Sequence, residues 1–396
     1  MRKICFVIYN RANYGRIKGL LYLLKNQKNI NLKIVLASSS ILKKYGSLDE
    51  ILKKDGFKID YKFYSHLEGE NKYTMTKSSG LIILELSSIF EALKPDLVVT
   101  TGDRYETLAT AICASYMNIC LAHIQGGELT GSIDEKVRHS VTKLSDYHFV
   151  ATKKAKKIVL QMGEREKTVF NTGCPSIDII KRTDLRKKIQ LKKYNFGIGE
   201  KINLNEKYLV VLLHPDTTEE NNNKKIVDET LNALKKIKHQ IIWLWPNNDS
   251  GANVISNNLR KFRENTKIKN VNFYKNFEPE DYLRLINGCS CLVGNSSSGI
   301  RESSFLGIPV VNIGNRQSLR EKGKNVIDVD LNKNEILKAV QKQIRKKKYR
   351  QENIYGSGNS EKKICNLLKK IKIKNKKIFK IFYFFLLYIL VKTLCG

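Results

Sequence analysis

The chain has 396 residues, of which 42% are hydrophobic, so it is long and apolar enough for two domains that each close a core. This composition excludes disorder as the default state. The formal net charge is +33, from 71 Lys and Arg against 38 Asp and Glu, which by itself suggests nucleic acid, a membrane surface or a polyanionic substrate. The excess is mostly lysine spread over the whole chain, without an RNP-like aromatic motif or a zinc finger, so we expect no nucleic-acid partner.

The cysteines and the N-terminus indicate the compartment. The sequence has eight cysteines with no C-x-x-C pair and no histidine at zinc-ligand spacing, and several of them lie inside apolar runs. The first residues lack the length and the small-residue cleavage site of a signal peptide. We therefore expect a reduced, cytoplasmic protein without a metal site.

Strand and helix signals alternate along the chain. Short apolar runs between polar or glycine-containing loops predict strands at 3–9, 32–38, 96–101, 118–124, 147–151, 168–172, 208–213, 240–245, 270–274, 291–294 and 308–313. Helical spacing of apolar residues predicts helices at 80–94, 104–117, 135–145, 224–237 and 299–306. Strands that are buried on both faces and separated by helices form parallel, doubly wound sheets, so we expect an α/β fold.

A change in composition divides the chain. Residues 181–206 are rich in Lys, Arg and Asn without a sustained apolar period, and they predict a linker between an N-terminal domain, 1–180, and a C-terminal domain, 207–350. Two Rossmann-like domains in tandem would face each other across a cleft at the carboxyl ends of both sheets, where open α/β folds bind ligands. Candidate functional residues are therefore sought in the loops that follow the predicted strands.

Residues 351–396 are predicted to form a basic tail that ends in a short apolar segment. Lys362–Lys380 is strongly basic, and the apolar run 381–391 after it is too short to span a bilayer. Peripheral membrane contact, a terminal helix docked on the body and a dispensable extension all remain open.

The loop 10–16, after the first strand, carries two arginines. Arg11 and Arg16 precede an apolar-periodic helix that is expected to start near Ile17. Two guanidinium groups beside a helix N-terminus suit a phosphate clamp, although a solvated loop with ordinary arginines explains them equally well.

Asp103 and Arg104 follow the strongly apolar strand at 96–101. Asp103 either caps the next helix or points into the ligand crevice from the carboxyl edge of a parallel strand. We favour the crevice.

A denser charged group follows the strand at 118–124. The paired glycines Gly126 and Gly127 allow a backbone to approach a ligand closely. Three carboxylates, an arginine and a histidine come soon after them, namely Glu128, Asp134, Glu135, Arg138 and His139. A helix-dipole or surface charge explains any one of these residues, but the density of the cluster favours a functional site suited to acid–base chemistry.

The C-terminal half places polar loops at the ends of its strands. His214 ends one strand and the loop 245–251 follows another, and either is structural or functional. The loop 294–302 offers backbone N–H groups and hydroxyls at a helix start, which suit a diphosphate, while Glu302 suits the two hydroxyls of a ribose. A G-x-G-x-x-G motif with a following acidic residue and a Walker A lysine are both missing, so we expect no dinucleotide cofactor and no ATP.

A series of motifs then points to one family. They are Arg-Ala-Asn-Tyr-Gly at 11–15, Thr-Gly-Asp-Arg-Tyr-Glu at 101–106, His-Ile-Gln-Gly-Gly-Glu at 123–128, Ile-Asp-Glu-Lys-Val-Arg-His at 133–139, Gly-Cys-Pro-Ser-Ile-Asp at 173–178 and Gly-Asn-Ser-Ser-Ser-Gly-Ile-Arg-Glu at 294–302. Their combination, in this order, resembles the hydrolysing UDP-N-acetylglucosamine 2-epimerases of sialic and legionaminic acid synthesis. The resemblance runs from about residue 2 to about residue 350 and excludes the tail.

The resemblance implies a GT-B arrangement of two Rossmann-like domains with a nucleotide sugar between them, no cofactor and a homo-oligomer. It implies catalytic roles for Asp103, Glu128 and Asp134. It also implies that the nucleotide diphosphate is held by Arg11, His214, Asn247, Ser296, Ser297, Glu302 and Arg316. Arg16 and Arg104, from the loops described above, are further candidates for substrate binding.

The expected reaction eliminates the nucleotide and then adds water, giving a free sugar inverted at C2. UDP-N-acetylglucosamine is the expected substrate, and a UDP- or GDP-linked 2,4-diacetamido-2,4,6-trideoxy sugar is the alternative. A GT-B glycosyltransferase is a more remote alternative. One departure concerns Gln125, where several members have Glu, because a glutamine accepts no proton at neutral pH. Any such role falls to Asp103, Glu128 or Asp134, or is unnecessary.

Overall fold

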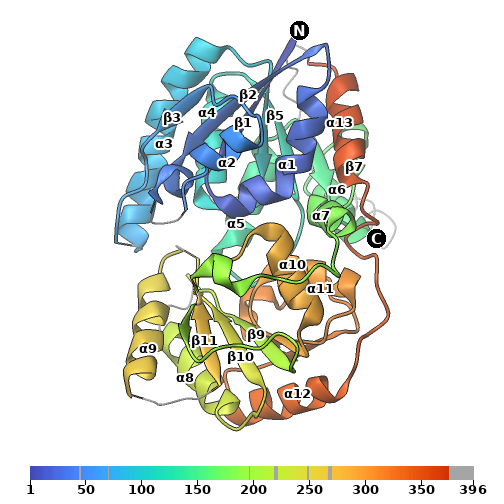
Figure 1. Ribbon diagram of the computed structural model, residues 1–396. Helices are drawn as coiled ribbons and strands as arrows, with labels where there is room; N and C mark the ends of the chain where they lie inside the picture. The colour runs from blue at the N-terminus through green and yellow to red at the C-terminus, as the bar shows by residue number, and fades with distance from the viewer. Residues whose placement is uncertain are drawn as a thin grey trace, which may run out of the picture.

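The computed structural model describes residues 1–43, 46–69, 71–195, 197–217, 222–247, 249–265 and 270–373. Two α/β domains lie one above the other, each built around one twisted sheet (Figure 1). We call the part that carries the first sheet the N-terminal domain and the part that carries the second sheet the C-terminal domain.

The N-terminal sheet has the strand order β3-β2-β1-β4-β5-β6-β7, and its paired strands are parallel. The strands are β1 (Arg2–Ile8), β2 (Ile30–Ala37), β3 (Tyr61–Phe63), β4 (Leu97–Thr101), β5 (Cys120–Ile124), β6 (Tyr147–Val150) and β7 (Val169–Asn171). The helices between them are α1 (Arg11–Lys25), α2 (Asp49–Lys54), α3 (Lys72–Leu93), α4 (Tyr105–Tyr116), α5 (Ile133–Leu144) and α6 (Lys153–Gln161).

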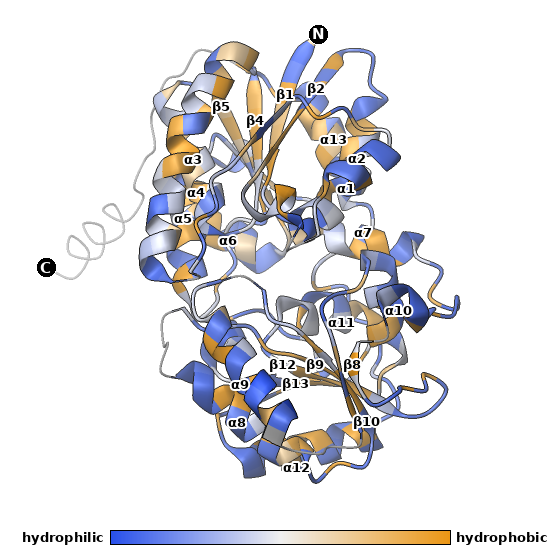
Figure 2. Cartoon of the chain, turned by 60° about the vertical axis from the view of Figure 1, so that its left-hand side comes forward, coloured by the Kyte–Doolittle hydropathy of each residue, from blue (hydrophilic) through white to orange (hydrophobic). Residues whose placement is uncertain are grey.

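The apolar faces of this sheet follow from strand alternation. Ile4, Phe6 and Ile8 of β1 pack into a core with α1, whereas Cys5 packs on the other face with α3 and α4. Both faces are covered, so the strands are apolar throughout, and Figure 2 shows them in orange between helices with hydrophilic outer faces.

The C-terminal sheet has the order β14-β13-β12-β9-β10-β11-β8, parallel except for β8, which runs antiparallel to β11. Its strands are β8 (Ile198–Gly199), β9 (Tyr208–Leu212), β10 (Gln240–Leu244), β11 (Val271–Tyr274), β12 (Cys291–Gly294), β13 (Val310–Ile313) and β14 (Val326–Val329). Its helices are α8 (Asn222–Leu234), α9 (Ala252–Asn265), α10 (Pro279–Gly288), α11 (Arg301–Leu306) and α12 (Lys333–Arg345).

Two segments connect the domains. Helix α7 (Pro175–Arg182) contacts α1 of one domain and α11 of the other. After α12 the chain crosses back, and α13 (Ser360–Lys370) lies beside α1 in the N-terminal domain (Figure 1). Ile364 and Leu368 of α13 are fully buried in the N-terminal core, so this part of the predicted basic tail is a docked helix, one of the alternatives left open by the sequence. The apolar run 381–391 lies outside the described residues.

Every strand that the apolar runs predict is present within two residues of the expected bounds. The strands that the sequence misses, β3, β8 and β14, all lie at sheet edges. An edge strand has one neighbour and exposed side chains, so it lacks the continuous apolar run that marks a central strand. The predicted helix start near Ile17 is wrong, because α1 begins at Arg11, where the side chain of Asn10 caps it by accepting from the N–H of Asn13 at 2.8 Å.

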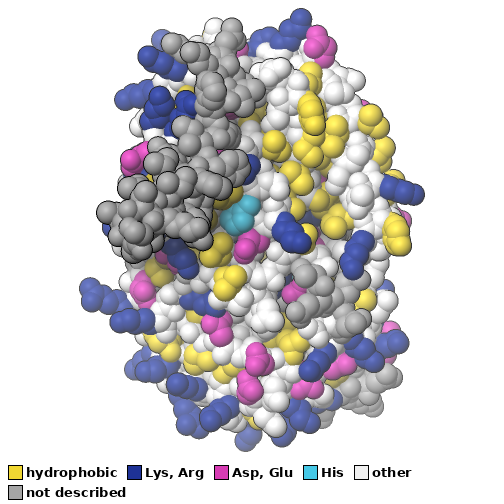
Figure 3. All heavy atoms as spheres, turned by 180° about the vertical axis from the view of Figure 1, so that it is seen from behind, with side chains coloured by type: hydrophobic (Ala, Val, Ile, Leu, Met, Phe, Trp, Pro, Cys, Tyr) yellow, Lys and Arg dark blue, Asp and Glu magenta, His cyan; other side chains and the backbone are white. Residues whose placement is uncertain are grey.

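The surface does not gather its positive charge in one place on the face that Figure 3 shows. Lys and Arg side chains lie scattered there among Asp and Glu, and hydrophobic side chains cluster on the N-terminal domain. Within the described ranges, every helix is too short or too polar to cross a bilayer.

Candidate active site

A cavity of about 970 Å³ lies between the two sheets, and residues of both domains line it. Loops at the carboxyl ends of β1, β4, β9, β10 and β12 contribute to its walls, as expected for open α/β sheets. Asp103 and Ser296, which come from different domains, share this cavity. The predicted site residues that line it are Arg11, Arg16, Asp103, Arg104, Asp134, His214, Asn247, Ser296, Ser297, Glu302 and Arg316.

Asp103 stands at the end of β4, directly after Gly102, whose φ of 87° turns the chain into the cavity. It does not cap α4. Its carboxylate instead accepts from the guanidinium of Arg138, which is fully buried in α5, and lies 3.6 Å from that of Arg320. Burial acts to raise the pKa of Asp103, but the charges of Arg138 and Arg320 hold it well below its usual range. The two guanidinium groups therefore favour the charged form of the Asp103 carboxylate.

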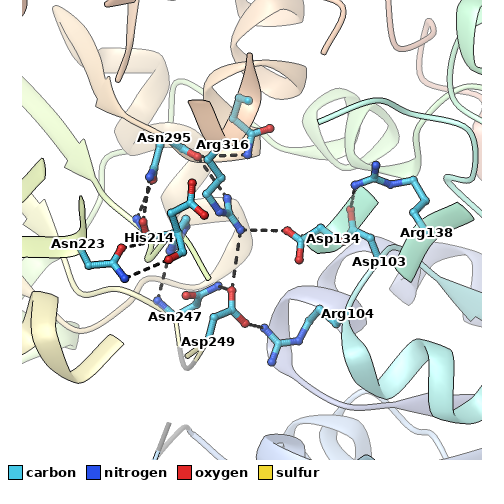
Figure 4. A network of polar contacts seen from close by, with 12 residues as sticks. Asp103, Arg104, Asp134, Arg138, His214, Asn223, Asn247, Asp249, Asn295 and Arg316 are labelled. Carbon is cyan, nitrogen blue, oxygen red and sulfur yellow. Dashed lines mark hydrogen bonds and ion pairs between the residues drawn. The ribbon is translucent and has the colours of Figure 1, made fainter. Parts of the chain in front are cut away.

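Asp134 lies in the first turn of α5 and faces the C-terminal domain (Figure 4). Its carboxylate is 3.5 Å from the guanidinium of Arg316. Burial and the neighbouring charge of Asp103 raise the pKa of Asp134 to about 6, against the opposing charge of Arg316. Two carboxylates with well-separated pKa values, one always charged and one able to exchange a proton near neutral pH, are typical of acid–base sites.

Glu128 is the predicted catalytic residue whose side chain does not line the cavity. Gly127, with φ of 76°, brings the chain so close to α6 that a Cβ there would lie 2.5 Å from the carbonyl oxygen of Ala155. The carboxylate of Glu128 is buried and accepts from Arg301 at 2.8 Å and from Arg320, both in the C-terminal domain. The sequence does not predict either arginine as a partner, because the contacts join positions far apart in the chain.

Arg11 and Arg16 line the cavity from the first turns of α1, not from a loop as the sequence predicts. Both therefore stand at the N-terminal end of a helix, where backbone N–H groups and the helix dipole also favour an anion.

His214 is held in one orientation by two loops of the C-terminal domain. Its backbone exchanges hydrogen bonds with the side chain of Asn295, at 2.7 and 2.9 Å, and its Nδ1 accepts from the backbone N–H of Asn247 at 3.3 Å. Burial and the charge of Arg316 lower the pKa of His214 to about 3. The ring is therefore neutral with its proton on Nε2, so it is a hydrogen-bond donor without a charge.

The loop after β12 combines hydroxyls with a helix start. Gly294 has φ of 141°, and an added Cβ there would lie 2.0 Å from the carbonyl oxygen of Leu212, so only glycine fits. Ser296 caps the next turn by accepting from the N–H of Ser298. Glu302, in the first turn of α11, lines the cavity with a buried Oε2 that has no hydrogen-bond partner among the described residues. Such an oxygen suits a hydroxyl of a bound ligand.

Arg104 joins the domains across the cavity (Figure 4). Its guanidinium contacts Glu106 at 3.0 Å and also Asp249, which belongs to the loop after β10. Asp249 in turn accepts from the side chain of Asn247 and lies 3.9 Å from Arg316. The sequence places Asp249 in a candidate loop but does not identify it as a partner of Arg104, since the contact depends on how the two domains meet.

Two Rossmann-like domains with the cavity between them define a protein of the GT-B-like fold. The crystal structure of UDP-GlcNAc 2-epimerase from Neisseria meningitidis bound to UDP-GlcNAc has this fold, with a TM-score of 0.76, 21% sequence identity and coverage of 93% of this chain and 100% of that one.

The family model for UDP-N-acetylglucosamine 2-epimerase matches residues 23–369, and the chain belongs to this family. It is 33% identical over 377 residues to the UDP-N,N'-diacetylbacillosamine 2-epimerase (hydrolyzing) of Legionella pneumophila, covering 95% of this chain and 98% of that protein. It is 35% identical over 333 residues to the GDP/UDP-N,N'-diacetylbacillosamine 2-epimerase (hydrolyzing) of Campylobacter jejuni, covering 84% of this chain and 85% of that protein.

Proposed function

We propose that the chain is a hydrolysing 2-epimerase, which converts a nucleotide-linked 2-acetamido sugar and water into the free 2-epimer and the nucleoside diphosphate. The observation that carries the proposal is that Asp103 and Asp134, whose charges interact, line the same cavity as Ser296, Ser297 and Glu302 from the other domain. The names of the Legionella and Campylobacter relatives support the hydrolysing reaction.

The chemistry requires that the bond to the leaving group weakens first. The C2 proton of such a sugar is not next to a carbonyl, so a carboxylate cannot remove it from the ground state. When the bond between C1 and the diphosphate oxygen breaks, positive charge develops at C1 and the C2–H bond becomes acidic. The C2 proton then leaves to a base, a 2-acetamidoglucal forms, and water adds across its double bond to give the inverted sugar.

The diphosphate end of the cavity is assigned to groups that stabilise negative charge. Arg11 and Arg16 supply positive charge from the start of α1, and Arg316 supplies it from the opposite domain. His214 donates through Nε2, and Ser296 and Ser297 add hydroxyls at a helix start. Donors and cations held in place before the bond breaks stabilise the leaving diphosphate as its charge develops.

The sugar end is assigned to the two aspartates. Asp134, with a pKa raised to about 6 by burial and the charge of Asp103, is the group that accepts the C2 proton. Asp103 stays charged beside Arg138 and Arg320, and it stabilises the positive charge at C1. Gln125 takes no part, because it is buried and its amide donates to the sulfur of Cys174.

Two substrates are the candidates. UDP-N-acetylglucosamine is the one that the sequence predicts, with N-acetylmannosamine as its product. The alternative from the sequence, a 2,4-diacetamido-2,4,6-trideoxy sugar on UDP or GDP, is favoured by the names of the two relatives described above, which name UDP-N,N'-diacetylbacillosamine and, for the Campylobacter protein, also its GDP-linked form.

A proton NMR time course in deuterated water tests the proposal, with each of the two sugar nucleotides supplied alone. The expected result with one of them is free UDP and a free sugar inverted at C2, with deuterium at that carbon. An epimerised sugar that stays attached to UDP would contradict hydrolysis. Turnover that needs an added acceptor would instead indicate a glycosyltransferase.

A further inference from the structure

Glu128 lies behind the cavity, at the boundary between the domains. Its side chain is buried, and Oε2 accepts from Arg301 at 2.8 Å and from Arg320. Both arginines line the cavity from the C-terminal side, whereas Glu128 does not. Two buried guanidinium groups donate to one oxygen of this carboxylate, and the carboxylate lies away from the ligand space. It is therefore poorly placed to exchange a proton with a substrate.

Both cationic partners of Asp103 are anchored on this residue. Arg320 reaches the carboxylate of Glu128 with one nitrogen and lies 3.6 Å from Asp103 with the other. Arg138 donates to the backbone carbonyl of Glu128 at 2.5 Å and to the carboxylate of Asp103. Glu128 therefore contacts each guanidinium that contacts Asp103.

The charges at this boundary depend on Glu128. Arg138, Arg301 and Arg320 are all buried, and Asp103 and Glu128 are the carboxylates that pair with them. Burial and the charge of Arg301 lower the pKa of Arg320 to about 10, against the attraction of Glu128. Without the carboxylate of Glu128, Arg301 and Arg320 repel each other in a poorly solvated space. This repulsion favours a different position of the Arg320 side chain.

The domains are in close contact at the same boundary. A Cβ on Gly131 would lie 2.1 Å from the carbonyl oxygen of Asn315, and Thr152 donates to the carboxylate of Glu321 from the other domain. Arg301 and Arg320 reach Glu128 across this same boundary.

We propose that Glu128 is a positioning residue. Its carboxylate holds Arg320 of the C-terminal domain and its backbone carbonyl holds Arg138 of the N-terminal domain, and these two guanidinium groups hold the carboxylate of Asp103 in its catalytic orientation. Glu128 itself exchanges no proton. This proposal rests on the proposed function for the role of Asp103. It couples the docking of the two domains to the geometry of the reacting carboxylate.

The test compares the wild type with Glu128→Gln and with the control Glu166→Gln, whose side chain is 78% exposed. For Glu128→Gln we expect kcat to fall by about 10 to 100-fold, because a misplaced catalytic group costs about this much. Inhibition by UDP should change little, since Glu128 contacts Arg138, Arg301 and Arg320, none of which is assigned to UDP. The pH profile of kcat should keep every limb that the wild type shows. The control should behave as the wild type.

Three results would overturn the proposal: loss of a limb that the wild-type pH profile of kcat shows, which would make Glu128 a proton carrier; an unchanged kcat; or an intact ion pair between Arg320 and Asp103 in a crystal structure of Glu128→Gln. The crystal structure of Glu128→Gln needs no substrate, so it tests the positioning of Asp103 independently of turnover. If the wild type turns over neither sugar nucleotide, the proposed function is refuted instead. If Glu128→Gln does not fold, Arg320→Lys is used instead, because it keeps the charge but loses the fork that reaches both carboxylates. An unchanged kcat, or a crystal structure of Arg320→Lys in which the side chain of Asp103 keeps its wild-type orientation, would then overturn the proposal.

Discussion

The carboxylate of Asp134 lies 3.5 Å from the guanidinium of Arg316, and the two residues belong to different domains. The group proposed to accept the C2 proton is thus tuned by a group proposed to hold the diphosphate. The pH dependence of the reaction reports on this contact.

We expect kcat/KM to fall as the pH drops below about 6, because Asp134 must be deprotonated to act as a base and its pKa is raised to about 6. Arg316→Gln removes a positive charge that lowers this pKa, so the pKa rises and the acid limb moves to higher pH. Arg186→Gln, at a side chain that is 96% exposed, is the control and should leave the limb in place. If the acid limb stays at the same pH in Arg316→Gln, Asp134 is not the group that titrates.

Asp103→Asn is expected to lower kcat by about 100 to 1,000-fold, as the loss of a preorganised electrostatic partner of the transition state does. The charge of Asp103 also raises the pKa of Asp134, so the acid limb should move to lower pH in this variant. Asp184→Asn, at an exposed carboxylate, serves as the control. Near-normal turnover by folded Asp103→Asn would remove Asp103 from the mechanism.

Glu302 is expected to recognise the ribose through its buried Oε2, which has no hydrogen-bond partner in the part of the chain that the structure describes. A hydrogen bond to a charged group contributes about 1.5 to 3 kcal/mol, so Glu302→Ala should weaken UDP binding by about 10 to 100-fold. Calorimetry with UDP and with 2'-deoxy-UDP measures the contact directly. The wild type should prefer UDP and Glu302→Ala should not, whereas an equal preference in both proteins would place the ribose elsewhere.

Gly131→Ala tests the contact between the domains. A Cβ at this position would collide with the carbonyl oxygen of Asn315, whereas one on Gly80 has nothing within 4 Å. We expect Gly131→Ala to hold the domains apart, to increase the radius of gyration in solution scattering and to lower kcat by about tenfold or more. Gly80→Ala is the matched control. Unchanged scattering and turnover in Gly131→Ala would mean that this contact is not needed.

Helix α13 is expected to contribute to the stability of the N-terminal domain. Ile364 is fully buried there, so Ile364→Ala should lower the free energy of unfolding by about 2 to 5 kcal/mol. Asn366→Ala, on the exposed side of the same helix, should change it by no more than about 0.5 kcal/mol. Urea unfolding of both variants measures the difference, and equal stabilities would show that the helix does not contribute.

The loops that line the cavity could be predicted from the sequence alone. Apolar runs such as Leu97–Thr101 are buried on both faces, and they alternate with helices, so they predict parallel sheets whose carboxyl ends share one edge. Asp103 and Ser296 each follow such a strand directly, and the same local pattern that makes the strand also places the side chain at that edge. These residues could be predicted because each depends on its own neighbours in the chain.

The partners of these residues were decided by the tertiary structure. Arg320 contacts both Asp103 and Glu128, and Asp249 contacts Arg104, although no local pattern marks these pairs. Each contact crosses between domains, and its geometry depends on how the two sheets are placed relative to each other. The sequence thus determined which acidic and basic groups reach the cleft. The docking decided which of them are paired and buried, and therefore that Asp103 stays charged while Asp134 can exchange a proton.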